Sequence, residues 1–184
     1  MLYVVEMDFG GTSRQAEWDA WYLEHLHVLL SLPGFHTAQR FVCLTPWRAP
    51  WLAIYTVDSP AVFESVPYRA RGGRDSTGEW KPLMRNWDRN VFDGLERAPA
   101  VGTEQALLLT DAEPASIGEL DVDFCWLEAV GLDRTVTRRG LAVVDAMLGR
   151  RLALTPMSPV RAYRPLMAQL DSSAPGSRDS GLQA

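Results

Sequence analysis

His25 is the residue whose surroundings in the sequence point most directly to chemistry. From Trp18 to Leu30, aromatic and apolar side chains recur at the spacing of one helical face, and that face also carries His25. An imidazole titrates near neutral pH, so a histidine on such a face can serve as a general acid or base. The other interpretation is a packed histidine that bonds a backbone carbonyl and holds the helix in place.

The neighbours of His25 on this face are aromatic. Tyr22 lies one turn earlier, where its hydroxyl can orient a substrate or the ring can simply pack. Trp18 and Trp21 extend the aromatic wall, which is typical of a pocket for an apolar ligand. His27 falls on a different face of the helix, so the two histidines cannot hold one metal ion, and we expect no metal site.

Three further positions carry side chains that suit a binding or catalytic role. His36 and Arg40 share one face of an expected strand, from which Arg40 can hold a carboxylate or a phenolate if that face lines a cavity. Trp87 and Arg89 share a face in the same way. Asp8 ends an expected first strand and is a candidate second acid or base. A packing or surface role is the alternative for each.

The elements that must position these residues follow from the pattern of residue types. We expect strands over 2–9, 35–44 and 51–57, a helix ending at Pro33-Gly34, a short helix over 61–66 and a fourth strand near residue 90. This β-α-β-β-α-β order is that of a ferredoxin-like module, here residues 1–95. Its helices cover one face of the sheet, so the other face needs a partner.

The second half of the chain has a weaker pattern. The order of its segments allows a degenerate second ferredoxin-like module over residues 104–168. We therefore expect an α+β fold in which such modules form a dimeric α/β barrel, with a homodimer unless the second copy closes the barrel within one chain. Residues 171–184 are polar and are expected to form a disordered tail.

Composition excludes several classes of protein. The net charge is −5 and no cluster of basic residues is present, so we expect no nucleic-acid partner. The chain has no apolar run long enough to span a membrane and no signal peptide, which predicts a cytoplasmic protein. The motifs of serine hydrolases, Rossmann dehydrogenases and P-loop kinases are missing, and no cofactor is expected.

Residues 18–41, WDAWYLEHLHVLLSLPGFHTAQRF, resemble the EthD-like families of the dimeric α+β barrel superfamily. The matching pattern is Trp-Tyr, Glu-His, Pro-Gly-Phe and Arg-Phe, and the similarity extends over about half of the chain. The resemblance implies a ligand cavity between the sheet and the first helix, and His25 occupies the position of the family's histidine. Related barrels include cofactor-free dehydratases, isomerases and monooxygenases, so the fold alone does not determine the chemistry.

These observations predict a cofactor-independent lyase, dehydratase or isomerase that acts on a small aromatic or lactone-like molecule in an aromatic-lined barrel cavity. His25 would transfer the proton, Tyr22 and Asp8 would assist it, and the remaining candidates would bind substrate. One alternative is an oxygen-using or heme-linked enzyme on the same barrel. Another is a protein that binds a ligand, or another protein, without catalysis.

Overall fold

The computed structural model describes residues 1–117, 120–155 and 158–172, without the side chains of residues 74 and 75. The strands are β1 (Leu2–Phe9), β2 (Phe35–Cys43), β3 (Trp51–Val57), β4 (Met84–Asp93), β5 (Gln105–Thr110), β6 (Cys125–Leu132), β7 (Arg138–Asp145), β8 (Val160–Pro165) and β9 (Leu170–Asp171). The α-helices are α1 (Gln15–Leu30), α2 (Val66–Arg71) and α3 (Ala146–Ala153). Most of the segment expected to be a disordered tail, from residue 173 onward, lies outside the described residues.

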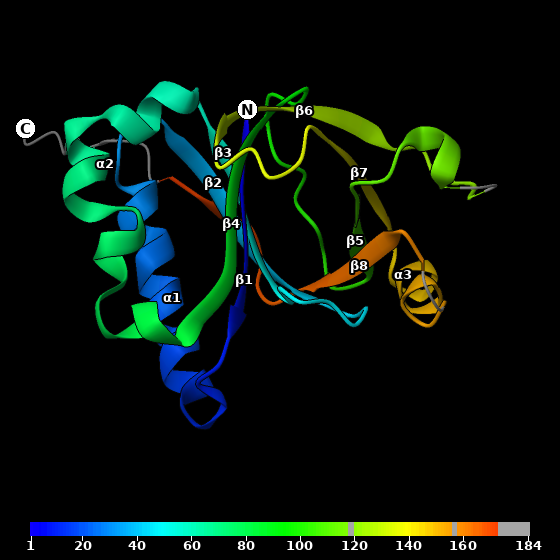
Figure 1. Ribbon diagram of the computed structural model, residues 1–184, viewed down its shortest axis with the longest axis horizontal. Helices are drawn as coiled ribbons and strands as arrows, with labels where there is room; N and C mark the ends of the chain where they lie inside the picture. The colour runs from blue at the N-terminus through cyan, green and yellow to red at the C-terminus, as the bar shows by residue number, and fades with distance from the viewer. Residues whose placement is uncertain (118–119, 156–157, 173–184) are drawn as a thin grey trace, which may run out of the picture.

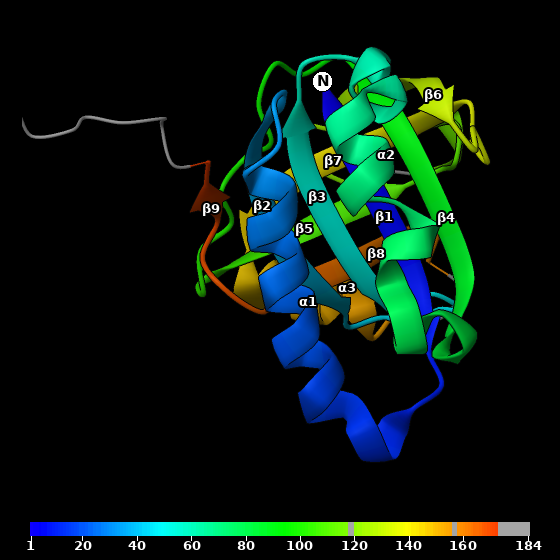
Figure 2. The ribbon, with the colours of Figure 1, turned by 90° about the vertical axis from the view of Figure 1, so that its left-hand side faces the viewer.

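Strands β1 to β8 form one closed antiparallel barrel. The strand order is β3-β1-β4-β6-β7-β5-β8-β2, and β2 pairs with β3 to complete the ring. Figure 1 shows α1 and α2 on one side of this barrel and α3 on the opposite side. In Figure 2, α1 and α2 lie in front of the strands of the first half.

The expected fold class, ferredoxin-like modules forming a dimeric α/β barrel, is wrong. The free edges of the first four strands pair with β6 and β8 of the same chain, so the sheet closes without a second copy. Both halves use the same strand order, β4-β1-β3-β2 and β8-β5-β7-β6, and α3 lies between β7 and β8 as α2 lies between β3 and β4, but the first helix is not repeated. Only an irregular segment with a three-residue helical turn is described between β5 and β6, where the first half has α1. The homodimer remains a prediction.

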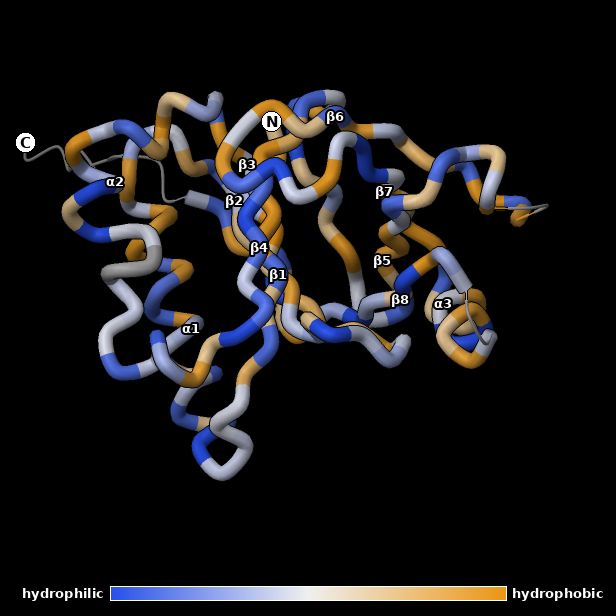
Figure 3. The backbone as a smooth tube through the Cα atoms, in the orientation of Figure 1, coloured by the Kyte–Doolittle hydropathy of each residue, from blue (hydrophilic) through white to orange (hydrophobic). Residues whose placement is uncertain are grey.

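Each half of the barrel packs on both faces, which gives the molecule separate cores. Leu2 and Val4 of β1 point into the barrel, whereas Tyr3 and Val5 point outward and are covered by α1. Because both faces are buried, β1 is a nearly continuous apolar run. Helix α1 carries hydrophobic and hydrophilic residues, as Figure 3 shows, and buries one face against the outside of the sheet.

The end of α1 is determined by Gly34. Its φ of +86° lies in the left-handed region that favours glycine, and a Cβ at this position would lie 2.6 Å from Val62 Cγ2. The backbone then enters β2, which pairs with β3 along most of its length. This turn places α1 across the outer face of β1 and β3, and thereby positions His25 over the sheet.

Candidate active site between the first helix and the barrel

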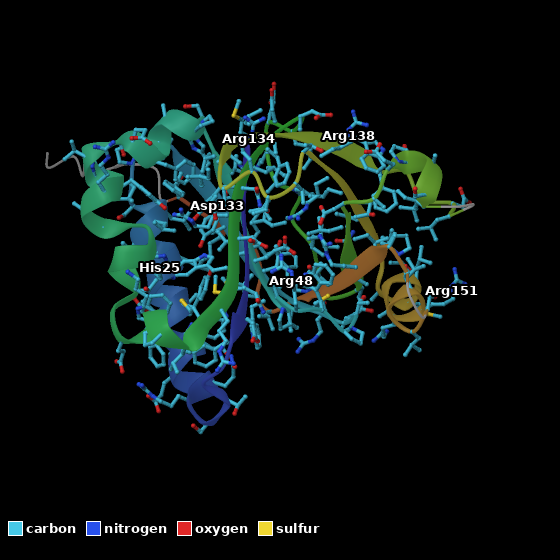
Figure 4. All side chains as sticks on the ribbon, viewed as in Figure 1. His25, Arg48, Asp133, Arg134, Arg138 and Arg151 are labelled. Atoms are coloured by element: carbon cyan, nitrogen blue, oxygen red, sulfur yellow. The ribbon has the colours of Figure 1, made fainter. Side chains whose placement is uncertain are left out.

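A small cavity of about 20 Å³ lies between α1 and the outer face of the barrel. Its lining residues are Tyr3, Val5, Tyr22, His25, Leu29, Tyr55, Tyr68, Gly73 and Trp87. In Figure 4, His25 lies on the side of α1 that faces the strands. The cavity lies between the sheet and the first helix, as the resemblance implied, but it is outside the barrel and not in the barrel cavity of the predicted function.

His25 is an uncharged imidazole that is half-buried between α1 and the sheet. Its ring stacks on Trp21, with centroids 5.1 Å apart and planes 15° apart, and it meets the Tyr22 ring edge-on. Burial lowers the pKa of His25 from its ordinary 6.5 to about 4, so the ring is neutral at pH 7. Among the described residues no group forms a hydrogen bond with this imidazole. Within that part of the chain the imidazole is therefore held by packing against Trp21 and Tyr22, and not by a bond to a backbone carbonyl.

Four tyrosines surround this imidazole, and three of them were missed in the sequence. Tyr3 and Tyr55 are cross-strand partners whose rings stack 5.2 Å apart, and Tyr68 belongs to α2. The hydroxyls of Tyr22 and Tyr55 lie close enough to influence each other's pKa, as do those of Tyr3 and Tyr68. Burial raises the pKa of each of the four, so all remain protonated phenols at pH 7.

Arg89 supplies the positive charge beside this cluster. It lies on the outward face of β4, its Nη2 is 3.3 Å from Asp133 Oδ1, and its charge lowers the pKa of the nearby Tyr68. Trp87, two residues earlier on the same face, lines the cavity. The structure thus brings together Tyr22, His25, Trp87 and Arg89, which the sequence had placed on separate elements.

Trp18 and Arg40 form a neighbouring cluster rather than part of the cavity wall. Arg40 is buried against α1, where its Nη2 bonds Asp19 Oδ1 at 2.9 Å. The guanidinium carbon of Arg40 lies 4.2 Å from the centre of the Tyr22 ring and 4.9 Å from that of Trp18. Arg40 therefore supports Tyr22 by packing and charge, with its carboxylate partner already in place.

Two expected site residues lie elsewhere. His36 Nε2 pairs with Asp58 Oδ1 at 2.5 Å on the surface, away from the cavity lining. Asp8 comes after a register shift in β1 and lies opposite Arg85 of β4. It is three residues past the last β1 residue that lines the cavity, so it does not belong to the site. The i, i+4 spacing placed His36 and Arg40 on one face, but the bulge between residues 35 and 37 changes the register there.

No family model matches the chain, and no curated protein matches it. A search of solved structures finds one described as an anthrone oxidase-like protein, with a TM-score of 0.53, 9% identity, and 94% of each chain covered. At this identity the likeness concerns the fold. No helix in the described ranges is both long and apolar enough to cross a membrane. Those ranges also contain no group of three or more His, Cys, Asp or Glu residues placed to hold a metal ion.

Proposed function

We propose that the protein is a cofactor-independent enzyme that removes a proton from a small aromatic molecule with His25 as the base. The observation that carries this proposal is a neutral imidazole without a hydrogen-bond partner among the described residues, set in a wall of phenols and indoles. A general base must be unprotonated at the working pH, and His25 meets that requirement.

The surrounding groups suit the anion that proton removal creates. The substrate proton moves to the free nitrogen of His25, and the electron pair stays on the substrate as an enolate or phenolate. Tyr68 and Arg89 can stabilise this negative charge, since a protonated phenol donates a hydrogen bond and a guanidinium adds charge. In an isomerase or a lyase, the anion is then reprotonated at another atom or expels a leaving group.

Substrate binding requires part of the cavity wall to move, because about 20 Å³ holds roughly one water molecule. The segment Gly72–Gly73 closes the cavity next to the Tyr68 ring, and Gly73 has a φ of +77°. An outward movement of this segment would open the site toward His25 without disturbing the barrel strands.

An oxygen-using reaction is the second candidate, and it is favoured by the structural neighbour, which is described as anthrone oxidase-like. An anthrone is a tricyclic aromatic ketone with an acidic methylene group, so the first step would again be proton transfer to a base. The carbanion would then react with O₂, and net conversion of the CH₂ to a carbonyl releases one water. The EthD-like resemblance is compatible with both reactions.

The test compares His25→Gln with His27→Gln, an exposed histidine on the same helix. Aromatic ketones, phenols and lactones are screened by thermal shift, and each stabilising compound is analysed by mass spectrometry with and without O₂. The proposal predicts conversion by wild type and by His27→Gln but not by folded His25→Gln. Turnover unchanged in His25→Gln, or compounds that bind and are always returned unaltered, would reject it.

A further inference from the structure

A larger pocket, of about 740 Å³, lies at one end of the barrel and shares no residue with the cavity at His25. Its described lining residues come from the β2–β3 loop, from the end of β5, and from the chain around the end of α3 and the start of β8. Most of them are apolar, and Arg161 and Asp111 are the charged ones among them. A pocket of this size at the mouth of a β-barrel is typical of small-molecule sites, which span roughly 300–1,000 Å³.

Arg161 is buried at this pocket with one edge of its guanidinium unused. The residue is 5% exposed, and its Nη1 lies 2.8 Å from Asp111 Oδ2. Its Nε and Nη2 are buried and form no hydrogen bond within the described part of the chain, the nearest carboxylate oxygen, Glu6 Oε1, being 3.7 Å from Nη2. Nε and Nη2 form the edge that binds a carboxylate through two parallel hydrogen bonds.

The carboxylates of this region already have their own partners. Arg139 donates from Nε and Nη2 to the two oxygens of Asp111, at 2.6 and 3.0 Å, and its Nη1 lies 2.8 Å from Glu6 Oε2. Tyr163 donates its hydroxyl to Glu6 Oε1. The two carboxylates balance the two guanidiniums in charge, yet the hydrogen-bonding capacity of Arg161 is not satisfied. A buried donor left in this way destabilises the protein, and a bound acceptor would remove that cost.

The rest of the pocket offers an apolar platform beside this edge. The Trp47 ring lies 4.5 Å from the guanidinium carbon of Arg161 and is 38% exposed, and Leu154 is 83% exposed. Arg150 and Arg151 lie in the last turn of α3, a few residues before Leu154 in the sequence, and carry positive charge. Figure 4 shows Arg151 on α3. Trp47 lies in a loop and shields Arg161, so the indole is the wall that a ligand displaces.

We propose that this pocket binds a small aromatic monocarboxylate. Its carboxylate would accept two hydrogen bonds from Nε and Nη2 of Arg161, and its ring would pack against Leu154 in the space that the Trp47 indole leaves. The site is separate from the proposed active site, since it shares none of the residues around His25.

Isothermal titration calorimetry with benzoate and phenylacetate, and with benzamide as the neutral counterpart, tests this proposal on the full chain. Wild type should bind a carboxylate at least tenfold more tightly than benzamide. Arg161→Gln should abolish that preference, while His25→Gln should leave it unchanged, which separates this proposal from the proposed function.

Because Arg161→Gln leaves Asp111 with one cation fewer and can unfold the protein, Leu154→Ser is the second variant. It changes an exposed wall of the pocket and leaves the ion pairs intact, so it should weaken carboxylate binding about tenfold. Met147→Ser, a 74% exposed apolar residue on α3 that does not line the pocket, is its matched control. Equal affinity for benzamide, no binding of either acid, or unchanged affinity in Leu154→Ser would overturn the proposal.

Discussion

The two polar regions of this molecule bury their groups in opposite ways. Around His25, burial keeps an imidazole and four phenols uncharged, and the positive charge of Arg89 lies at the edge. At the barrel end, Asp111 and two arginines stay charged because each lies within reach of an opposite charge, and Glu6 Oε2 lies 2.8 Å from Arg139 Nη1. A neutral base is suited to moving a proton, whereas a compensated ion cluster with a spare guanidinium edge is suited to holding an anion. The proposed catalytic site and the proposed anion site rest on this difference.

The largest effect is expected when the ion cluster is broken. Arg139→Leu removes the cation between Glu6 and Asp111 and leaves a buried and a half-buried carboxylate underpaired. Losing one partner of a buried pair typically costs about 3–5 kcal/mol of folding free energy. Urea unfolding measures this loss. The control is Arg138→Leu, which changes an exposed arginine next to Arg139 on the same strand. Similar stability of the two variants would contradict the description of the cluster as compensated charge.

The two regions should lose folding stability at different pH values when the protein is acidified. The folded pKa of His25 is about 4, below its ordinary 6.5, so between these values the unfolded chain binds the extra proton and stability falls as pH falls. The loss is complete near pH 4 and amounts to at most about 3 kcal/mol. Stability measured from pH 7 to pH 4 should fall less steeply in His25→Gln than in wild type. Parallel curves would contradict a buried neutral histidine.

Asp111 should respond at lower pH. Burial alone would raise its pKa, but Arg139 and Arg161 outweigh that effect and hold the pKa below its ordinary value of 3.8. Its charged form therefore stabilises the fold above that value, and this stabilisation is lost as pH falls through the folded pKa. Asp111→Asn should remove the component of acid unfolding below pH 3.8 and leave the component of His25 in place.

A smaller effect is expected from the phenol pairs. Tyr55→Phe removes the hydroxyl that faces Tyr22 and keeps the stacked ring beneath the site. The expected loss is at most about 1 kcal/mol, because removing one buried hydroxyl forfeits no more than one hydrogen bond between neutral groups. Thermal unfolding of Tyr55→Phe and wild type measures this loss.

The smallest effect is expected for His36→Ala, which removes the exposed pair with Asp58. Its loss of stability, measured in the same way, should be below about 1 kcal/mol.

The local elements of the first half were predictable from residue types. The strands over 2–9 and 51–57 have the expected bounds, and the aromatic face of α1 is the buried one. The spacing of Tyr22 and His25 placed both in one cavity because i and i+3 share a helical face. The 10-residue β4 then brought Trp87 and Arg89 alongside them.

The remaining features depend on contacts that no local pattern contains. The fold class was wrong because ring closure rests on pairing of strands far apart in sequence, such as β4 with β6. Tyr3 and Tyr55 were missed because β1 and β3 are buried on both faces, which removes the period-two signal for the outward side. Arg139 and Arg161 look like ordinary surface arginines in the sequence. Their role appears only when β7 and β8 place them in the barrel.

The most direct test of the central claim, that the neutral His25 is a base, is the turnover of an identified aromatic substrate by His25→Gln and His27→Gln. Loss of a general base typically lowers the rate by about 10²–10⁴. The account predicts such a loss in His25→Gln, with folded protein and wild-type affinity for benzoate at the barrel end, and wild-type turnover in His27→Gln. Equal turnover by the two variants would show that His25 is not the base.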